Sequence, residues 1–150
     1  MTLRETARLL ASCFLAVGLL ADRAEADGAG GGSAAPVALR PDALEWRAVP
    51  GFPGMIARVW GPADGPQARF IKLPANAKLP LHEHTATVRV VVVSGTYVYG
   101  LQGEPERRYE AGSFVVTPGG TAHVAGCSDA CVYFEELDAK PDFIPVPAKR

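Results

Sequence analysis

The sequence predicts an all-β fold of the sandwich or jelly-roll type for the region that starts near Leu39. Short apolar runs rich in valine, isoleucine, phenylalanine and tyrosine follow one another there, and these residue types favour strands. Glycine or proline separates the runs at a spacing typical of proteins built from many short strands. Beyond residue 26, no stretch of ten residues carries a convincing 3.6-residue apolar period, so no helix is expected.

Eight strands are expected in this region. Residues 94–95, a Ser-Gly pair, are expected to form a tight hairpin turn between two of them. Residues 74–77 and 118–120 are expected to be loops because of their proline, asparagine and glycine content. The expected strands are Trp46–Val49, Met55–Trp60, Ala68–Leu73, Thr87–Val93, Thr96–Leu101, Ser113–Thr117, Ala122–Ala125 and Cys131–Leu137.

Residues 1–26 are expected to be a secretory signal peptide. Arg4 and Arg8 form a basic start, residues 9–21 form an apolar run, and Ala24-Glu25-Ala26 offers a small-x-small cleavage site. The apolar run is shorter than the roughly 20 residues that a membrane-spanning helix needs. We therefore expect a periplasmic or secreted protein without a stable membrane anchor, the alternatives being an uncleaved anchor and a lipoprotein signal at Cys13.

The mature part of the chain is expected to hold one domain. Residues 27–38 are rich in glycine and alanine and are expected to be a flexible linker. Residues 39–150 then form a single domain, which is long enough to bury a core. The formal net charge of the full chain is -1, and no basic field indicates a nucleic-acid partner.

The chain has three histidines, and their positions suggest a metal site. His82 and His84 are two residues apart, so in an extended segment their side chains lie on the same face. His123 follows the Pro-Gly-Gly turn at residues 118–120, which can bring it back to the same end of a barrel. Imidazole is the commonest protein ligand for transition metals. Three imidazoles would leave positions open for water or a substrate.

These residues resemble the two motifs of the cupin superfamily. The first motif has His-x-His, then a glutamate and a glycine, and the second reads Gly-x5-Pro-x-Gly-x2-His. The resemblance covers about residues 69–136 and is closest to small, single-domain, exported cupins without a settled function. It implies a cupin-type β-barrel, the double-stranded jelly roll, with one divalent metal inside. The matching positions are His82, His84 and Gly95 for the first motif, and Gly112, Pro118, Gly120 and His123 for the second.

The glutamate of the first cupin motif is missing. Its position falls on Val88, which cannot bind a metal, and Arg89 stands next to it. Three neutral ligands would leave the metal charge uncompensated and favour an anionic ligand from outside. Arg89 could hold a substrate carboxylate, or it could be a surface arginine paired with a glutamate. Iron, zinc, manganese, nickel and copper are not distinguished by this ligand set.

Other polar residues near the motifs have open roles. One of Glu135 and Glu136 should point inward, because neighbouring strand residues alternate. An inward glutamate could serve as a fourth ligand, as a partner of a ligand or as a general base, and otherwise it is a solvated strand-end charge. Tyr97, Tyr99 and Tyr133 either line the pocket or belong to the core.

Cys127 and Cys131 remain after signal cleavage and flank an expected hairpin turn. An exported chain meets an oxidising compartment, in which a disulfide between them would persist and pin the turn. The alternatives are two free thiols or a thiol site for redox chemistry or metal.

The sequence leaves three function classes open. The first is a metal-dependent enzyme, such as an oxygenase, isomerase or lyase, that acts on a small polar molecule. The second is a non-catalytic cupin that binds or senses a metal or small ligand, and the third is a barrel whose site has decayed. The resemblance also implies a homodimer, since small cupins pair through sheet edges and open edges are a liability.

Overall fold

A computed structural model describes residues 36–147 of the chain. The expected signal peptide, residues 1–26, and most of the expected linker, 27–38, lie outside the described residues. A 3-10 turn, Pro41–Ala43, precedes the strands. The strands are β1 Arg47–Ala48, β2 Met55–Trp60, β3 Gln67–Leu73, β4 Lys78–Glu83, β5 Val88–Ser94, β6 Thr96–Leu101, β7 Arg107–Glu110, β8 Phe114–Thr117, β9 His123–Cys127, β10 Cys131–Leu137 and β11 Ile144–Pro145.

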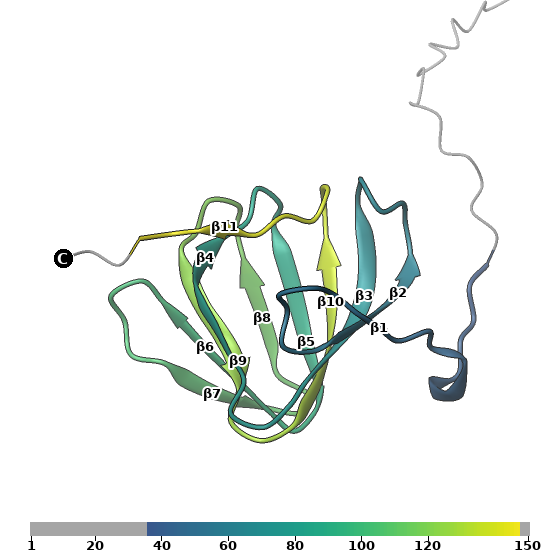
Figure 1. Ribbon diagram of the computed structural model, residues 1–150, viewed down its shortest axis with the longest axis horizontal. Helices are drawn as coiled ribbons and strands as arrows, with labels where there is room; N and C mark the ends of the chain where they lie inside the picture. The colour runs from purple at the N-terminus through teal and green to yellow at the C-terminus, as the bar shows by residue number, and fades with distance from the viewer. Residues whose placement is uncertain (1–35, 148–150) are drawn as a thin grey trace, which may run out of the picture. The chain divides into compact units, whose positions relative to one another are not determined.

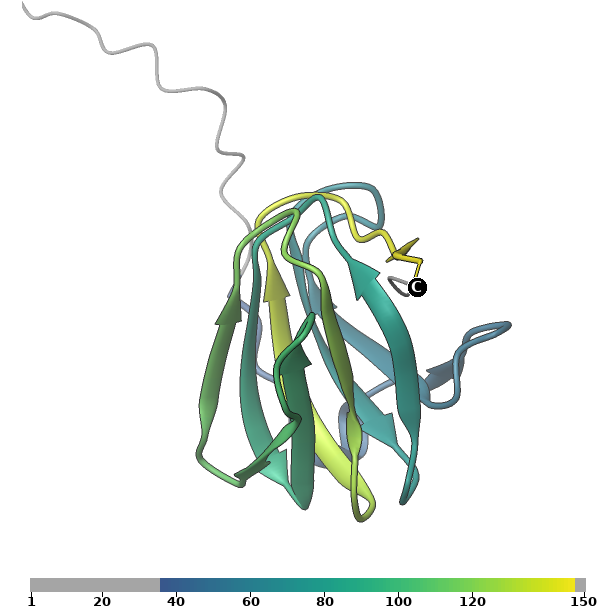
Figure 2. The same ribbon diagram turned by 90° about the vertical axis from the view of Figure 1, so that its left-hand side faces the viewer.

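The fold is all-β, as predicted, and consists of two antiparallel sheets (Figure 1). One sheet has the strand order β1-β2-β3-β10-β5-β8, and the other has the order β11-β4-β9-β6-β7. The strands of both sheets run in similar directions (Figure 2). The two sheets face each other and enclose one interior. This is the jelly-roll arrangement that the sequence predicts. Among the described residues, no helix has the length and apolar character that crossing a membrane requires.

Strand alternation separates an inner layer from an outer face. In β10, every second residue is buried, from Cys131 to Leu137, and in β5 the buried residues are Val88, Val90 and Val92. These side chains point between the sheets, where burial of apolar surface stabilises the fold. The interior is not purely apolar, because it also contains the three histidines and Glu135. It therefore serves both as the core and as the wall of a polar site.

Three strands are absent from the set that the sequence predicts, namely β4, β7 and β11. β4 contains Pro80, which has no N–H to donate, and its register against β9 shifts between Leu79 and His82. β7 is polar along its length and pairs with β6 at the edge of its sheet, and β11 has only two residues. Such segments form strands because they pair with neighbouring strands of the sheet, and a local sequence pattern does not reveal this pairing.

The expected hairpin at Ser94-Gly95 is wrong, because the chain crosses there from one sheet to the other. β5 belongs to the six-stranded sheet and β6 to the five-stranded sheet, and the same holds for β10 and β9. Gly95 has a φ of 70°, and a Cβ on it would lie 2.2 Å from the main-chain oxygen of Ala130. The two crossovers therefore pack against each other, and glycine is required at their contact.

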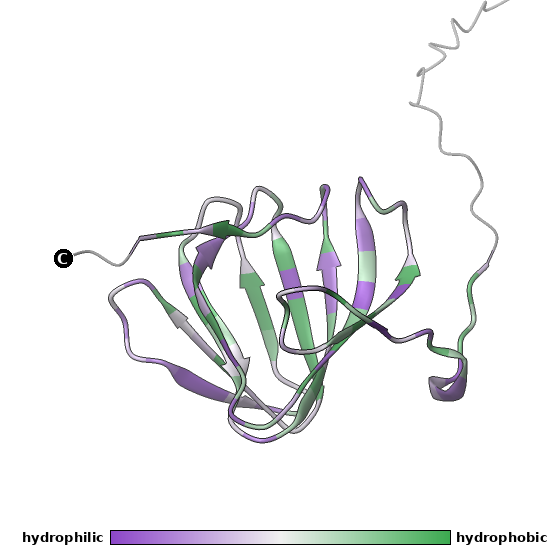
Figure 3. Cartoon of the chain, in the orientation of Figure 1, coloured by the Kyte–Doolittle hydropathy of each residue, from purple (hydrophilic) through white to green (hydrophobic). Residues whose placement is uncertain are grey.

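The outer face of the six-stranded sheet carries exposed apolar side chains along β5 and β8. Figure 3 shows both strands largely green, in contrast to the purple β7 of the other sheet. Val91 and Phe114 are register partners on neighbouring strands. The residues of this outer apolar patch are Val91, Val93, Phe114 and Val116, which are 39%, 49%, 59% and 50% exposed.

Candidate metal centre

The structure brings the three histidines together at one end of the barrel. His82 lies in β4, His84 directly follows this strand, and His123 begins β9. β4 and β9 are neighbours, and His82 and His123 are register partners. All three side chains are buried, and their candidate ligand atoms lie within 4.8 Å of one another. The fold thus brings His123 next to His82 and His84, from which it is about 40 residues away in the sequence.

The hydrogen bonds of the histidines fix which ring nitrogen is free. The Nδ1 of His82 lies 2.7 Å from the main-chain oxygen of Pro80, and the Nδ1 of His123 lies 2.8 Å from that of Thr121. The Nδ1 of His84 lies 2.6 Å from the main-chain oxygen of Asp142. A carbonyl oxygen only accepts, so each Nδ1 carries the proton and donates. Each Nε2 then presents a lone pair, which is how imidazole binds a metal.

The surroundings also keep two of these imidazoles, those of His82 and His123, neutral. Burial lowers the pKa of His82 to about 4, and the neighbouring His123 and His84 add to the effect, although the hydrogen bond with Pro80 opposes it. Burial likewise lowers the pKa of His123. Both side chains are therefore unprotonated near neutral pH and can act as ligands without first losing a proton. The donor set fits a divalent transition metal.

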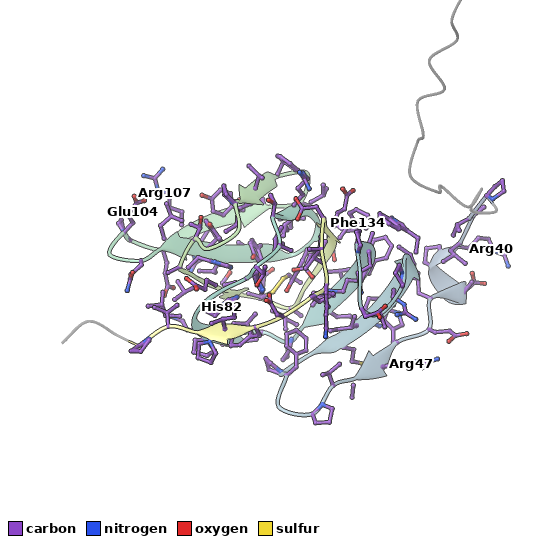
Figure 4. The ribbon with its side chains drawn as sticks, turned by 90° about the horizontal axis from the view of Figure 1, so that it is seen from above. Arg40, Arg47, His82, Glu104, Arg107 and Phe134 are labelled. Atoms are coloured by element: carbon purple, nitrogen blue, oxygen red, sulfur yellow. A yellow bond between two sulfur atoms is a disulfide. The ribbon has the colours of Figure 1, made fainter. Side chains whose placement is uncertain are left out.

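A segment after β10 covers the histidines, and we call residues 141–146 the C-terminal strap. Its strand β11 pairs with β4, and Val146 donates its N–H to the oxygen of Leu81 at 3.0 Å. The ring of Phe143 stacks on that of His82, with centroids 4.2 Å apart. In Figure 4, His82 is labelled beside the yellow strand β11. The strap thus supplies both an apolar cover and the hydrogen-bond acceptor of His84.

Asp142 anchors this strap. Its carboxylate accepts hydrogen bonds from the N–H of Thr85 at 3.0 Å and from the hydroxyl of Thr85 at 2.5 Å. Burial opposes ionisation of Asp142, but these bonds and the neighbouring His84 hold its pKa below the ordinary value. The anchor is therefore a charged carboxylate at neutral pH.

The histidines open into a cavity of about 740 Å³ between the sheets. Its wall is mostly apolar and includes Val88, so the position of the missing cupin glutamate faces the same space as the histidines. Ligand sites in proteins have this size and this mixture of apolar wall and few polar groups. The wall also includes Phe52, Ile56, Arg69, Ile71, Val90 and Glu135.

Of the two glutamates at the end of β10, Glu135 points inward and Glu136 outward. Glu135 is 6% exposed and accepts a hydrogen bond from Nε of Arg69 at 2.5 Å. It is not part of the group of close metal-ligand atoms, which among the described residues contains only the three histidines. From its position in the cavity wall, Glu135 remains a candidate for two of the expected roles, a partner of a metal ligand or a general base.

Arg89 and Glu136 lie outside the cavity wall. They are register partners on β5 and β10, and the Nη1 of Arg89 lies 3.9 Å from a carboxylate oxygen of Glu136. The same atom lies 3.8 Å from a carboxylate oxygen of Asp138. Of the two roles that the sequence leaves open for Arg89, this arrangement corresponds to a surface arginine paired with a glutamate.

The tyrosines contribute to both the core and the cavity. Tyr97 and Tyr133 line the cavity, with ring centroids 5.0 Å apart, and Tyr99 lies 5.3 Å from the ring of His123. Burial raises the pKa of both Tyr97 and Tyr133, and the charge of Glu135 raises them further. Their phenols therefore remain protonated and can donate hydrogen bonds.

A disulfide joins Cys127 and Cys131 across the crossover between β9 and β10, with Cα atoms 5.9 Å apart. The turn between them is not a hairpin, because the two strands belong to different sheets. The bridge therefore links the strand that begins with His123 to the strand that carries Glu135.

Several residues of the site have no counterpart in the motifs. Arg69, Asp142 and Phe143 all lie in the cavity wall, but sequence reasoning did not single them out. For Arg69 a signal existed, since it is a charged residue in the same strand phase as Ile71 and Leu73. For Asp142 and Phe143 no local pattern marks a strap that docks on a distant strand.

Comparison with protein families supports the resemblance seen in the motifs. Residues 34–140 match the family described as the ChrR cupin-like domain. This range contains all three histidines, Val88, Arg69 and Glu135. No curated protein matches the chain.

Solved structures show the same fold at low identity. The polyketide cyclase RemF from Streptomyces resistomycificus has a TM-score of 0.62 at 16% identity, over 75% of this chain and 87% of the cyclase. An RmlC-like cupin from Ralstonia eutropha JMP134 has a TM-score of 0.58 at 24% identity, over 68% of each chain. The DMSP lyase DddQ from Ruegeria pomeroyi DSS-3 has a TM-score of 0.59 at 18% identity, over 73% of this chain and 64% of the lyase.

Proposed function

The chain belongs to the ChrR cupin-like family, and from this premise we propose that it is a metal-dependent enzyme that binds one divalent metal through His82, His84 and His123. The metal would act on a small organic molecule held in the cavity between the sheets. A bound divalent metal supplies Lewis-acid chemistry, and a redox-active one supplies oxygenase chemistry as well. The residues of this chain position the ligands, exclude water and hold the substrate.

The observation that carries the proposal is the shared orientation of the three imidazoles. Each Nδ1 donates to a main-chain oxygen, so three Nε2 lone pairs remain for a metal. Buried histidines that served only as core residues would need no such common tautomer. Metal-binding histidines usually donate the N–H of the other ring nitrogen to a carbonyl or carboxylate oxygen in this way.

An enzyme is favoured over a non-catalytic binding or sensing protein by the cavity. A structural site is closed by protein ligands, whereas a catalytic site keeps an open position. Among the described residues, only three candidate ligands come together here, and they line a cavity of about 740 Å³ whose wall also contains Glu135 as a candidate base. Similar folds named as a polyketide cyclase and a DMSP lyase show that this architecture can host enzymes.

The test is the metal content of the purified protein and of two variants. We expect one equivalent of divalent metal in the unaltered protein, measured by elemental mass spectrometry. His123→Ala should lose it, because removing one of three ligands weakens binding by several kcal/mol. Glu83→Ala is the matched control, since Glu83 is flanked by two ligands but lies outside the cavity wall. One equivalent of metal retained in His123→Ala would show that the site is misplaced.

Export belongs to the same proposal. The basic start and apolar run of the first 26 residues, together with the cysteine pair, support a periplasmic or secreted location. Cleavage after Ala26 should yield a mature chain that starts at Asp27, and intact-mass measurement of protein from the periplasmic fraction checks this. A chain that retains Met1, or a lipidated Cys13, would contradict it.

We also propose that the protein is a homodimer. The outer apolar patch on β5 and β8 supports this assembly, because exposed patches of large apolar side chains mark interaction sites. β8 is in addition the edge strand of its sheet.

A further inference from the structure

The cavity contains a second polar group besides the histidines, the buried pair of Arg69 and Glu135. The two residues are register partners on β3 and β10, which lie side by side in the right half of the barrel in Figure 1. Their side chains are only 15% and 8% exposed. Removing two charges from water is costly unless they are paired and hydrogen-bonded, so a pair in this place needs a reason.

The hydrogen bonding of Arg69 is incomplete within the protein. Its Nε donates to Glu135, whereas among the described residues neither Nη has an acceptor. No buried side-chain nitrogen without a partner is found in this part of the chain, so both Nη groups must reach open space. Arg69 itself lines the cavity, so the cavity is open space within reach of its guanidinium. The Nη groups, which have no acceptor among the described residues, are thus available to a ligand there.

The charges around the cavity favour an anion at this point. Glu135 is already occupied by Arg69, and the carboxylate of Asp142 is held by Thr85. Lys78, at another part of the wall, pairs with Glu106 at 3.1 Å. Arg58 on β2 is the register partner of Arg69 and adds a positive charge beside it, although its side chain is exposed and lies outside the cavity wall. A divalent metal on three neutral imidazoles would add further positive charge.

The remaining wall is mostly apolar. Phe52 and Ile56 line the cavity together with Ile71, Val88 and Val90. Such a wall favours a ligand with a hydrocarbon body, and the paired donors of a guanidinium match the two oxygens of a carboxylate. A small polar molecule such as a sugar is disfavoured as the ligand, because it would leave the apolar part of the wall without an apolar partner.

We propose that Arg69, oriented by Glu135, is the carboxylate-binding residue of this cavity, and that the substrate is a small organic acid with an apolar aliphatic or aromatic body. The inference rests on the proposed metal-dependent function, of which it names the substrate class. It assigns to Arg69 the anion-binding role that the sequence suggested for Arg89, and it makes Glu135 the residue that positions the guanidinium.

The experiment uses protein loaded with one equivalent of zinc and titrated by calorimetry with phenylacetate and hexanoate. Phenylacetamide, which is neutral and similar in shape to phenylacetate, is the paired probe. We expect at least one of the acids to bind and phenylacetamide to bind at least about tenfold more weakly than phenylacetate, because it cannot form the charged pair. Failure of both acids to bind, or equal binding of acid and amide, would overturn the inference.

Two variants test the residue itself. Arg69→Lys keeps a charged partner for Glu135 but offers one nitrogen in place of the fork, so acid binding should weaken by about tenfold or more. The double variant Arg69→Met with Glu135→Gln removes both charges and leaves no buried carboxylate unpaired, and it should lose the preference for acid over amide. Arg89→Lys, on the outer face, should bind like the unaltered protein.

Zinc content measured on the same samples separates the two claims. Protein that takes up no zinc contradicts the proposed function. Zinc-loaded Arg69→Lys that binds the acids as tightly as the unaltered protein contradicts only the role of Arg69. A metal-free sample adds a further check, because an acid that coordinates the metal alone would lose all its binding there, whereas binding through Arg69 should persist in part.

Discussion

Val88 lies at the position where the first cupin motif has a glutamate, and its side chain is 4% exposed in the wall of the cavity. It occupies the inward phase of β5, as do Val90 and Val92. A valine there leaves the histidine site without a carboxylate and keeps this part of the wall apolar. The residue therefore affects both the charge of the proposed metal site and the surface that the cavity offers to a ligand.

Val88→Glu should restore a fourth ligand. We expect zinc affinity to rise by about tenfold, because an anionic oxygen would compensate part of the metal charge. The metal-free variant should be less stable than the unaltered protein, since its new carboxylate is buried without a partner. Competition with a chromophoric chelator measures the affinity.

Val90→Glu is the control for this substitution. Val90 has the same phase and is equally buried, but it is the register partner of Glu135, where a second carboxylate meets a like charge. It should not strengthen zinc binding. An unchanged affinity in Val88→Glu would mean that position 88 does not approach the metal.

Among the elements, the C-terminal strap makes the most direct contacts with the histidines of the proposed metal site. It provides the acceptor for His84, the ring that stacks on His82 and a strand that pairs with β4. The carboxylate of Asp142 attaches it to Thr85. Release of a metal from beneath such a cover requires the strap to move.

Asp142→Ala should therefore speed the release of zinc. Hydrogen bonds to a charged group contribute about 1.5–3 kcal/mol, so loss of the anchor should raise the release rate by about tenfold or more. The measurement is the rate at which zinc passes to an excess of chelator. Asp138→Ala is the matched control, because its carboxylate accepts from the N–H of Thr87 at 2.8 Å but lies outside the cavity wall. Equal rates in the two variants would show that the strap does not control release.

The elements also show which parts of the site the sequence could predict. The histidines can be predicted because each lies inside a short motif. Alternation in β10 predicts that one of Glu135 and Glu136 points inward, but it does not say which one. Arg69 meets Glu135 across a separation of 66 residues, and Asp142 meets Thr85 across 57. These contacts depend on strand order and register, which local patterns do not contain. For the same reason a local pattern predicts hairpins at the two places where the chain crosses between the sheets.

At the scale of the whole molecule, the outer face of the six-stranded sheet differs from an ordinary solvent-facing surface. Phe114 and Val116 are more exposed than is usual for large apolar residues, and Val91 and Val93 extend the patch onto β5. Arg89 and Glu136 border it with opposite charges. A patch with both charges at its rim can meet its own copy about a twofold axis, because each charge then finds its opposite.

Phe114→Glu should convert the proposed dimer to a monomer. The substitution would place two carboxylates in one twofold interface, where they are costly to desolvate and repel each other. Light scattering coupled to size exclusion at micromolar concentration measures the mass. Leu39→Glu replaces a residue of similar exposure, 49%, away from the sheet and should leave the mass unchanged. A monomer mass for the unaltered protein, or a dimer mass for Phe114→Glu, would contradict this interface.

The place of the strap in the chain also bears on when the metal can enter. His82 and His84 precede His123 by some 40 residues, and the acceptor that orients His84 belongs to Asp142, after every strand except β11. During synthesis from the N-terminus, His82 and His84 are therefore made well before Asp142, whose main-chain oxygen orients His84. The complete site forms only in a finished barrel. An exported chain would therefore bind its metal only in the compartment in which it folds. The concentrations of the divalent metals there would decide which ion the three imidazoles bind, because imidazole suits several of them.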